Sequence, residues 1–324
     1  MTIQTFLEFD NNSLIPLLYG EHNAHLTYIE KKLGVNIADR GNRLSFSGDA
    51  QAIKTAQYVL NTLWDKLEKK QMVGTAEIDA ALRFFNDRQK NGKADTDKDE
   101  DSAHVLIRTK KKSISARTPN QKKYIEMIQK NEMVFGIGPA GTGKTYLAVA
   151  AGVAMFLEGK VERLVFCRPA VEAGENLGFL PGDMKEKVDP YLRPIYDALH
   201  DTLHWDYMMK KMETGEIEIA PLAFMRGRTL ANAFVVLDEA QNATCGQMKM
   251  FLTRMGEASR MVITGDLTQT DLPRGVKSGL QDAQDILENV PEIQFMYFNS
   301  KDVVRHHLVG KIIEAYEQFP KKSD

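Results

Sequence analysis

The sequence is poor in cysteine, in net charge and in long apolar runs, and each shortage excludes a class of protein. Its two cysteines, Cys167 and Cys245, are too few for a disulfide framework. No apolar run reaches the length needed to span a bilayer. Residues 1–10 are neither basic nor continuously apolar, so they do not resemble a secretory signal. We therefore expect a cytoplasmic protein with no membrane partner.

The formal net charge is −2, because 42 Lys and Arg residues nearly balance 44 Asp and Glu residues. A balanced chain has no basic field over the whole molecule, so a nucleic-acid partner would be held by local patches. Residues 108–123 form one basic run, with seven basic residues and no acidic one. Such a run fits either nucleic-acid contact or an ordinary solvated linker.

Residues 1–70 predict a small α+β domain. We expect strands at 3–9, 35–38 and 43–47, and helices at 13–19, 25–33 and 50–66. This β-α-α-β-β-α order is that of KH-like RNA-binding domains, in which a loop between two helices clamps the nucleotide backbone. Residues 20–23 would be that loop, but Asn23 stands where a second glycine is expected and adds bulk near a phosphate. RNA binding and a packing or assembly role both stay open.

Residues 71–107 predict a short helix followed by a linker. Ile78, Ala81, Leu82 and Phe85 recur at helical spacing and mark an amphipathic helix. Residues 87–102 are almost entirely polar, which is typical of a solvated linker at a domain boundary.

Residues 108–324 predict an α/β domain. Apolar runs at 133–137, 164–167, 234–237, 261–263 and 293–298 are separated by helix-sized intervals, as in a buried parallel sheet with helices on both faces. Such a sheet binds its ligand at the carboxyl ends of its strands.

One of these strands leads into a phosphate loop that opens a helix predicted over 146–156. Its glycines allow a tight turn whose N–H groups face the β-phosphate. Lys144 adds a positive charge for the β- and γ-phosphates, and the Thr145 hydroxyl suits Mg²⁺. The loop consists of Gly138, Pro139, Ala140, Gly141, Thr142, Gly143, Lys144 and Thr145.

Two further strands end in polar groups. Asp238 and Glu239 follow an apolar strand, the first suited to a Mg²⁺ shell and the second to polarising an attacking water. Together with the phosphate loop, this pair indicates NTP hydrolysis. Asp266 and Gln269 would approach the γ-phosphate, although a simple turn at this point is the alternative. Gln121, placed before a helix at 122–129, would pair with the adenine edge.

Other features favour plain structural roles. Residues 168–194 are rich in Pro and Gly and predict an irregular surface lobe that meets a polymer or a neighbouring molecule, or else an insertion without function. His200 and His204 are four apart on an expected helix but lack a third ligand, so we interpret them as surface histidines and not a zinc site. Cys167 is expected to be a buried strand residue.

From about residue 117 to residue 316 the chain resembles the PhoH family of P-loop ATPases, whose motifs are similar to those of superfamily 1 helicases. The resemblance implies a RecA-like fold with ATP and Mg²⁺ bound. It implies that Gln121 contacts adenine and that Lys144 and Thr145 bind the phosphates and the metal. It also implies that Asp238 and Glu239 bind the metal and the attacking water, and that Gln269 contacts the γ-phosphate. The matching stretches are 117–121, 135–150, 168–183, 187–194, 223–230, 237–242, 247–254 and 302–306.

The sequence thus predicts an Mg²⁺-dependent ATPase that couples hydrolysis to RNA remodelling or unwinding. The alternative is an ATP-switched RNA adaptor with little turnover, and relatives of this short form imply an rRNA-processing endoribonuclease of the YbeY type as partner. A GTPase is disfavoured because residues 299–302 do not match the guanine-reading pattern. A small-molecule kinase is disfavoured because the Asp-Glu pair suits water attack.

The chain has room for one ATPase core. If no arginine of this core reaches its own γ-phosphate, a neighbouring copy must supply one. We therefore expect a homo-oligomer, a six-membered ring, with Arg305, Arg254 or Arg228 acting across the interface.

Overall fold

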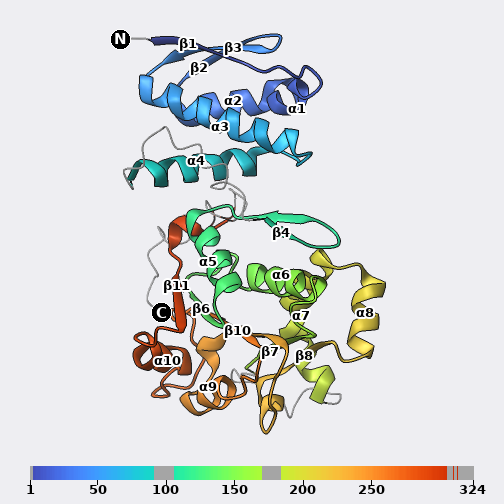
Figure 1. Cartoon of the computed structure of the whole chain (residues 1–324). Coiled ribbons are helices and arrows are strands. Elements are labelled where there is room, and N and C mark those ends of the chain that lie inside the picture. Colours follow the sequence, from blue (N-terminus) through green and yellow to red (C-terminus); the bar gives the residue numbers. More distant parts are fainter. Residues whose placement is uncertain (1–2, 91–105, 170–183, 305–308, 310–311, 313–324) are drawn as a thin grey trace. The chain divides into compact units, whose positions relative to one another are not determined.

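The computed structural model describes residues 3–90, 106–169, 184–304, 309 and 312 (Figure 1). The chain divides into two compact units. The N-terminal unit comprises residues 1–105 and 116–119, and the C-terminal unit comprises residues 106–115 and 120–324. Each is described by itself below.

The N-terminal unit has the β-α-α-β-β-α order predicted for it, followed by one more helix. Three antiparallel strands pair in the order β1-β3-β2, and the helices of this unit cover one face of the sheet (Figure 1). The elements are β1 (Ile3–Glu8), α1 (Ile15–Tyr19), the 3₁₀ turn η1 (Glu21–Asn23), α2 (Ala24–Leu33), β2 (Asn36–Arg40), β3 (Arg43–Gly48), α3 (Ala50–Glu68) and α4 (Thr75–Lys90).

Alternation along β3 builds the core of this unit. Leu44 and Phe46 are fully buried against the helices, while Arg43 and Ser45 point to the opposite face. Helix α3 begins after Asp49, whose carboxylate accepts from the N–H groups of residues 51 and 52 and so caps the first turn.

The polar linker begins later than its composition predicted. Residues 87–90 belong to α4, because Arg88, Gln89 and Lys90 are good helix formers that extend the helix to its polar end. Arg88 also lies over the ring of Tyr58 in α3, with 5.4 Å between the guanidinium carbon and the ring centroid. The remainder of the predicted linker, 91–102, lies outside the described residues.

The C-terminal unit contains a six-stranded sheet in the order β11-β6-β10-β9-β7-β8, with every neighbouring pair parallel. A separate hairpin of β4 (Leu106–Arg108) and β5 (Ser113–Ser115) precedes it. The remaining elements are α5 (Pro119–Lys130), β6 (Met133–Ile137), α6 (Lys144–Leu157), β7 (Arg163–Arg168), α7 (Met184–Thr202), α8 (Trp205–Glu213), β8 (Ile217–Pro221), η3 (Leu222–Met225), β9 (Ala233–Leu237), η4 (Ala240–Asn242), α9 (Cys245–Leu252), β10 (Arg260–Gly265), α10 (Gly279–Leu287), β11 (Ile293–Tyr297) and η5 (Ser300–Asp302).

All five strands predicted for this unit are present, and the fold class is α/β as expected. Strand β8 was not predicted. It lies at the edge of the sheet, where Glu218 interrupts its apolar residues and Pro221 ends it. An edge strand is covered less completely than a central one, so its sequence lacks the continuous apolar run of β6 or β9.

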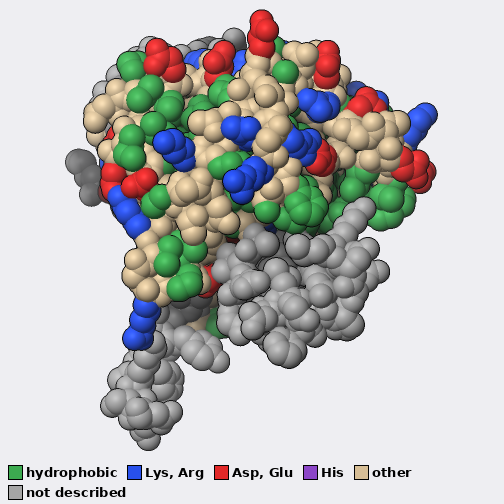
Figure 2. Space-filling view, turned by 90° about the horizontal axis from the view of Figure 1, so that it is seen from below, with side chains coloured by type: hydrophobic (Ala, Val, Ile, Leu, Met, Phe, Trp, Pro, Cys, Tyr) green, Lys and Arg blue, Asp and Glu red, His purple; other side chains and the backbone are tan. Residues whose placement is uncertain are grey.

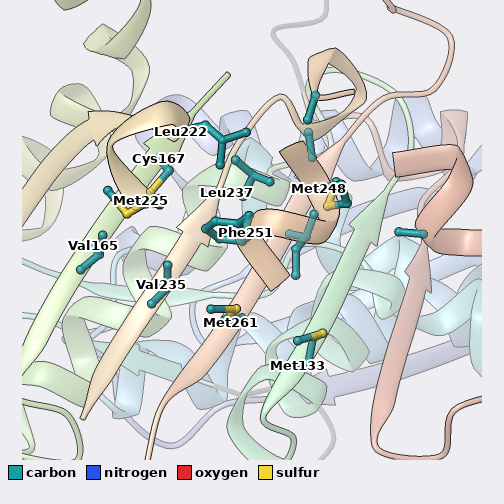
Figure 3. Close-up of a cluster of buried hydrophobic side chains, with 14 of the residues drawn as sticks. Met133, Val165, Cys167, Leu222, Met225, Val235, Leu237, Met248, Phe251 and Met261 are labelled. Carbon is teal, nitrogen blue, oxygen red and sulfur yellow. The ribbon is translucent and has the colours of Figure 1, made fainter. Parts of the chain in front are cut away.

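Helices cover both faces of the large sheet. On one face, α6 packs on β9 so closely that Gly152 faces the ring of Phe234. On the other face, Met248 and Phe251 of α9 and Leu222 and Met225 of η3 lie against residues of the strands (Figure 3). The strand residues in that cluster include Met133, Val165, Cys167, Val235, Leu237 and Met261. Cys167 is fully buried, as predicted, and burial raises the pKa of its thiol.

The prediction of an irregular lobe over 168–194 is partly wrong. Residues 170–183 lie outside the described residues, but residues 184–202 form α7, which contains Pro190 and Pro194. A proline inside a helix removes one backbone hydrogen bond. The helix persists because Leu192, Ile195 and Leu199 recur on one face and are buried, and tertiary packing supplies most helical stability.

Both signs of charge occur on the surface. Figure 2 shows one face of the molecule, on which Lys and Arg side chains gather near the middle and Asp and Glu side chains lie mainly toward the upper rim. This distribution fits the balanced net charge and leaves local patches as the places where a charged partner would bind. None of the helices in the described part of the chain combines the length and the apolar character that a membrane-spanning segment needs.

Candidate active site

A cleft of about 740 Å³ lies at the carboxyl ends of the central strands of the large sheet. Three strands deliver its polar groups: β6 leads into the phosphate loop, β9 ends before Asp238, and β10 ends before Asp266. The structure therefore brings the three predicted motifs together. Residues of all three line the cleft, namely Ala140, Gly141, Gly143, Lys144, Thr145, Asp238, Glu239, Asp266 and Gln269.

The phosphate loop has the backbone that its glycines were expected to allow. Gly141 and Gly143 have φ of 80° and 84°, which non-glycine residues rarely adopt. At Gly138, where φ is 147°, an added Cβ would lie 2.5 Å from the carbonyl oxygen of Phe298. Gly143 is the N-cap of α6, so the loop ends at a helix N-terminus whose free N–H groups favour an anion.

Lys144 begins α6 and folds back over its own loop. Its Nζ donates to the carbonyl oxygens of Gly138 at 2.6 Å and Pro139 at 2.8 Å. Burial lowers the pKa of Lys144, although the nearby Asp266, Asp238 and Glu239 act in the opposite direction. The ammonium thus stands inside the loop, where phosphate oxygens of a nucleotide would be stronger partners than two carbonyls.

Asp238 forms a buried carboxylate beside two hydroxyls. Its Oδ1 accepts from Thr145 Oγ1 at 2.6 Å and from Thr264 Oγ1 at 2.8 Å, and its exposure is 2%. Its Oδ2 has no aligned hydrogen bond, although Arg168 Nε lies 3.1 Å away as an ion pair. A buried carboxylate with an under-used oxygen next to a threonine hydroxyl is an oxygen donor set that fits Mg²⁺.

Glu239 is held from both sides. Its backbone is left-handed, with φ 52° and ψ 39°, a strained conformation that is common at functional sites. Its Oε1 accepts from Arg168 Nη2 at 2.8 Å, and its Oε2 accepts from Gln241 Nε2 at 2.5 Å. The side chain is still 42% exposed, so the carboxylate faces the cleft while its neighbours fix its orientation.

Arg168 and Gln241 were assigned no role from the sequence. Arg168 ends β7 at the same sheet edge as the other motifs and bridges Asp238 and Glu239. Gln241 follows the Asp-Glu pair, and its Oε1 accepts from the N–H of Asp266 at 3.0 Å. The signal that could have found Arg168 was a charged residue at the carboxyl end of an expected strand.

The third motif forms a hydrogen-bonded turn that contacts the second. Asp266 Oδ2 accepts from Gln269 Nε2 at 2.8 Å, and Asp266 Oδ1 accepts from Thr268 Oγ1 at 2.7 Å. The carbonyl of Gln269 accepts from Gln241 Nε2 at 3.2 Å. The turn offered as the alternative reading is therefore present, and it places Gln269 at the wall of the cleft.

Gln121 lies inside α5 and not before it. Pro119 opens the helix, as prolines commonly do at a first helical position. The Gln121 side chain is buried and its Nε2 donates to the carbonyl of Thr142 at 2.9 Å. Its amide therefore supports the phosphate loop, and its contact with adenine stays a prediction.

Helix α7 forms a further wall of the cleft that the sequence did not predict. Asp201 Oδ2 accepts from Tyr146 Oη at 2.8 Å and forms an ion pair with Lys112 of the β4–β5 hairpin. His200, also in α7, stacks on the ring of Trp205 with 4.4 Å between centroids. His204 is the N-cap of α8. The expectation that the two histidines share one helix is therefore wrong.

The arginines predicted to act across an interface have different surroundings. Arg228 makes two hydrogen bonds to the carboxylate of Glu218, at 2.6 and 2.7 Å. Arg254 donates to the carbonyls of Met250 and Arg228. Both are therefore engaged within their own chain, and Arg305 lies outside the described residues.

Comparison with known proteins shows the family of the chain. Residues 113–317 match the family model of the PhoH-like protein. The chain is 48% identical over 301 residues to a PhoH-like protein of Bacillus subtilis, covering 93% of both chains. It is 45% identical over 205 residues to the protein PhoH of Escherichia coli K12, covering 63% of this chain and 58% of that one. The solved UvsW helicase of bacteriophage T4 aligns at 11% identity with a TM-score of 0.37, covering 60% and 64% of the two chains, too weak a similarity to support an inference.

Proposed function

The chain belongs to the PhoH-like protein family and has the architecture of a P-loop NTPase, and from this premise we propose an Mg²⁺-dependent ATPase that couples hydrolysis to RNA remodelling. One observation carries the proposal. Glu239 stands at the cleft with its carboxylate oriented by Arg168 and Gln241, next to the Thr145–Asp238 pair. That arrangement suits activation of a water and not mere nucleotide retention.

The residues of the phosphate loop would bind ATP. The N–H groups at the start of α6 and the ammonium of Lys144 supply positive charge where the β- and γ-phosphates would lie. A bound phosphate would replace the carbonyls of Gly138 and Pro139 as the partner of Lys144.

Thr145 and Asp238 would hold Mg²⁺. The ion neutralises charge that develops on the phosphate oxygens. The hydroxyls of Thr145 and Thr264 and the guanidinium of Arg168 hold the Asp238 carboxylate in place for this role.

Glu239 would accept the proton of the attacking water, and Gln269 would contact the γ-phosphate region from the turn after β10. Arg168 acts as a positioning residue because one guanidinium holds both carboxylates. Its charge is engaged by these two carboxylates, so an arginine from a neighbouring copy stays our proposal for the γ-phosphate.

A homo-oligomer, most simply a six-membered ring, remains our proposal for the assembled protein. Its support is that a single ATPase core lacks the second core between which related helicases place the nucleotide. Arg305 is the candidate for a contact across the interface, since Arg228 and Arg254 are engaged within the chain. Sedimentation with bound ATP would contradict the proposal by showing a monomer at high concentration.

RNA is the proposed polymer because the N-terminal unit has the element order of KH-like domains. The alternative is an adaptor that binds ATP and RNA for an endoribonuclease of the YbeY type and turns over little. Phosphate release should be measured with and without RNA, in the wild type and in Glu239→Gln. If RNA stimulates phosphate release by the wild type and Glu239→Gln abolishes that release, the ATPase is supported. If the wild type releases phosphate no faster than Glu239→Gln, the ATPase is contradicted.

A further inference from the structure

The sheet of the N-terminal unit has an outer face that its helices do not cover. A hollow of about 550 Å³ lies on this face. Small side chains at Ala38, Ser45 and Ser47 leave the room for it, and no acidic residue lines it. The lining residues are Phe6, Asn36, Ala38, Arg40, Arg43, Ser45, Phe46 and Ser47. We propose that this outer sheet face binds single-stranded RNA, as a surface separate from the loop at residues 20–23.

The first argument is an exposed stacking surface. The ring of Phe6 in β1 is 51% exposed, although a phenylalanine is normally buried. The guanidinium of Arg43 in β3 lies over this ring, 4.1 Å from its centroid. An aromatic ring and a flat guanidinium at the surface offer unpaired bases the contacts that single-strand binders use.

The second argument is an unfavourable pairing of like charges. Arg40 and Arg43 face each other directly across β2 and β3, beside the turn at residues 41 and 42. Neither has an ion-pair partner among the described residues. Like charges directly opposite one another destabilise a sheet, and a phosphate between them would remove the repulsion. On the β1 side of β3, Glu8 lies opposite Arg43. The three paired residues Glu8, Arg43 and Arg40 therefore keep one net positive charge.

The third argument is the polarity of the rest of the hollow. Asn36, Ser45 and Ser47 provide amide and hydroxyl groups that can pair with base edges or with a 2′-hydroxyl. A protein partner would be expected to need a wider apolar patch, whereas Phe6 is the one exposed large apolar side chain among the lining residues. Nucleic acid therefore fits the surface better than a protein does.

The identity of the polymer rests on the proposed function, but the binding itself does not need ATP. Binding of a labelled twelve-nucleotide oligo(U) to the full chain should therefore be measured by fluorescence anisotropy without nucleotide, at several salt concentrations. Failure of RNA to stimulate turnover, with binding retained, would count against coupling and not against this surface.

Three variants test the face. Arg40→Gln/Arg43→Gln should weaken binding at least tenfold at low salt and reduce the slope of log affinity against log salt by about 0.7, the value for the one phosphate between the two arginines. Phe6→Leu should weaken binding about tenfold and leave the salt slope unchanged, since it removes stacking and not charge. Arg43→Lys keeps the charge and should lose only the stacking part of the affinity.

The matched control is Lys31→Gln/Lys69→Gln, which removes two exposed cations from α2 and from the end of α3. It should change affinity less than threefold. The two arginines are exposed, so their replacement should leave folding intact, which circular dichroism would verify. Affinity and salt slope equal to those of the control would overturn the proposal and leave the face to a protein partner.

Discussion

The two units expose their sheets in opposite ways. In the C-terminal unit, helices cover both faces of a parallel sheet, so β6 and β9 are buried along their whole length. In the N-terminal unit, the antiparallel sheet has helices on one face, and alternate residues of β3 reach the other. The first arrangement leaves only the edges of the sheet for chemistry, whereas the second leaves a whole face for recognition. Our two proposals follow this division, with hydrolysis assigned to the C-terminal unit and RNA binding to the N-terminal unit.

The largest expected effect is on ATP hydrolysis by the C-terminal unit, and its absence would contradict this division of roles. Glu239→Gln should lower kcat for ATP hydrolysis by about 10²- to 10⁴-fold, because the amide cannot accept a proton from water. Its ATP affinity and its RNA binding should be unchanged. Phosphate release and anisotropy would be measured on the same preparation.

The control for that experiment is Glu292→Gln, which removes an exposed carboxylate just before β11. A matching fall in its turnover, or a loss of RNA affinity in Glu239→Gln, would contradict the division. Lys144→Ala should in addition lose nucleotide affinity, because no other side-chain ammonium lines the cleft in the described part of the chain.

A second experiment sharpens the assignment of Arg168. Arg168→Ala should lower kcat about 10- to 100-fold with KM for ATP nearly unchanged, because the carboxylates of Asp238 and Glu239 lose their common partner. Arg168→Lys should restore little, since a lysine cannot span both. A raised KM with unchanged kcat would argue against a positioning role.

Mixing Arg168→Ala with Glu239→Gln then tests whether the arginine serves its own core. If Arg168 serves its own Glu239, no subunit of the mixture has an intact pair, and the mixture should release phosphate no faster than the residual activity of its Arg168→Ala subunits. Recovery of phosphate release on mixing would show that a neighbour supplies the arginine.

A third prediction compares packing in two helices of the C-terminal unit. Gly152→Ala should destabilise this unit by about 1–3 kcal/mol, because the new Cβ would lie 2.5 Å from Cδ1 of the buried Phe234 ring. Gly246→Ala in α9 is the control, since no atom lies within 4 Å of an added Cβ. It should be neutral or stabilise by up to about 1 kcal/mol.

Two tryptophans make this measurement specific to one unit. Trp64 lies in α3 of the N-terminal unit and Trp205 in α8 of the C-terminal unit. Urea unfolding followed by Trp205 fluorescence in a Trp64→Phe background should show the Gly152→Ala shift. An equal shift followed by Trp64 alone would mean that the units unfold together.

The smallest effect concerns a buried cation in the N-terminal unit. Burial lowers the pKa of Lys66 in α3, with Arg117 acting in the same direction and Glu77 in the opposite one. The unfolded chain therefore binds more protons than the folded one between the lowered pKa and about 10.5, so stability should rise with pH through that window. Lys66→Met should raise stability at pH 7 by about 1 kcal/mol.

The pH dependence provides the check on that prediction. The difference in unfolding free energy between Lys66→Met and the wild type should shrink as the pH rises toward 10.5. A difference independent of pH would mean that the gain comes from packing and not from removing the charge.

The motifs were predictable because their chemistry is local. Residues 138–145 need only their own backbone to form the loop, and Asp238 and Glu239 follow an apolar strand that reads as buried. The first half of α7, residues 184–194, was not predictable, because Pro190 and Pro194 oppose a helix and only packing of its apolar face reverses that preference. Strand β8 was missed for a similar reason, since its pairing with β7 decides its conformation.

What the sequence determined by itself was the inventory: a parallel α/β unit with a phosphate loop and two carboxylates, preceded by a small unit of KH-like order. What the tertiary structure decided was which side chains meet. Arg168 reaches Asp238 and Glu239 because β7 and β9 are neighbours in the sheet, and Arg43 lies over Phe6 because β3 pairs with β1. Such contacts join residues far apart along the chain, so only strand order and register, which sequence periodicity does not specify, could bring them together.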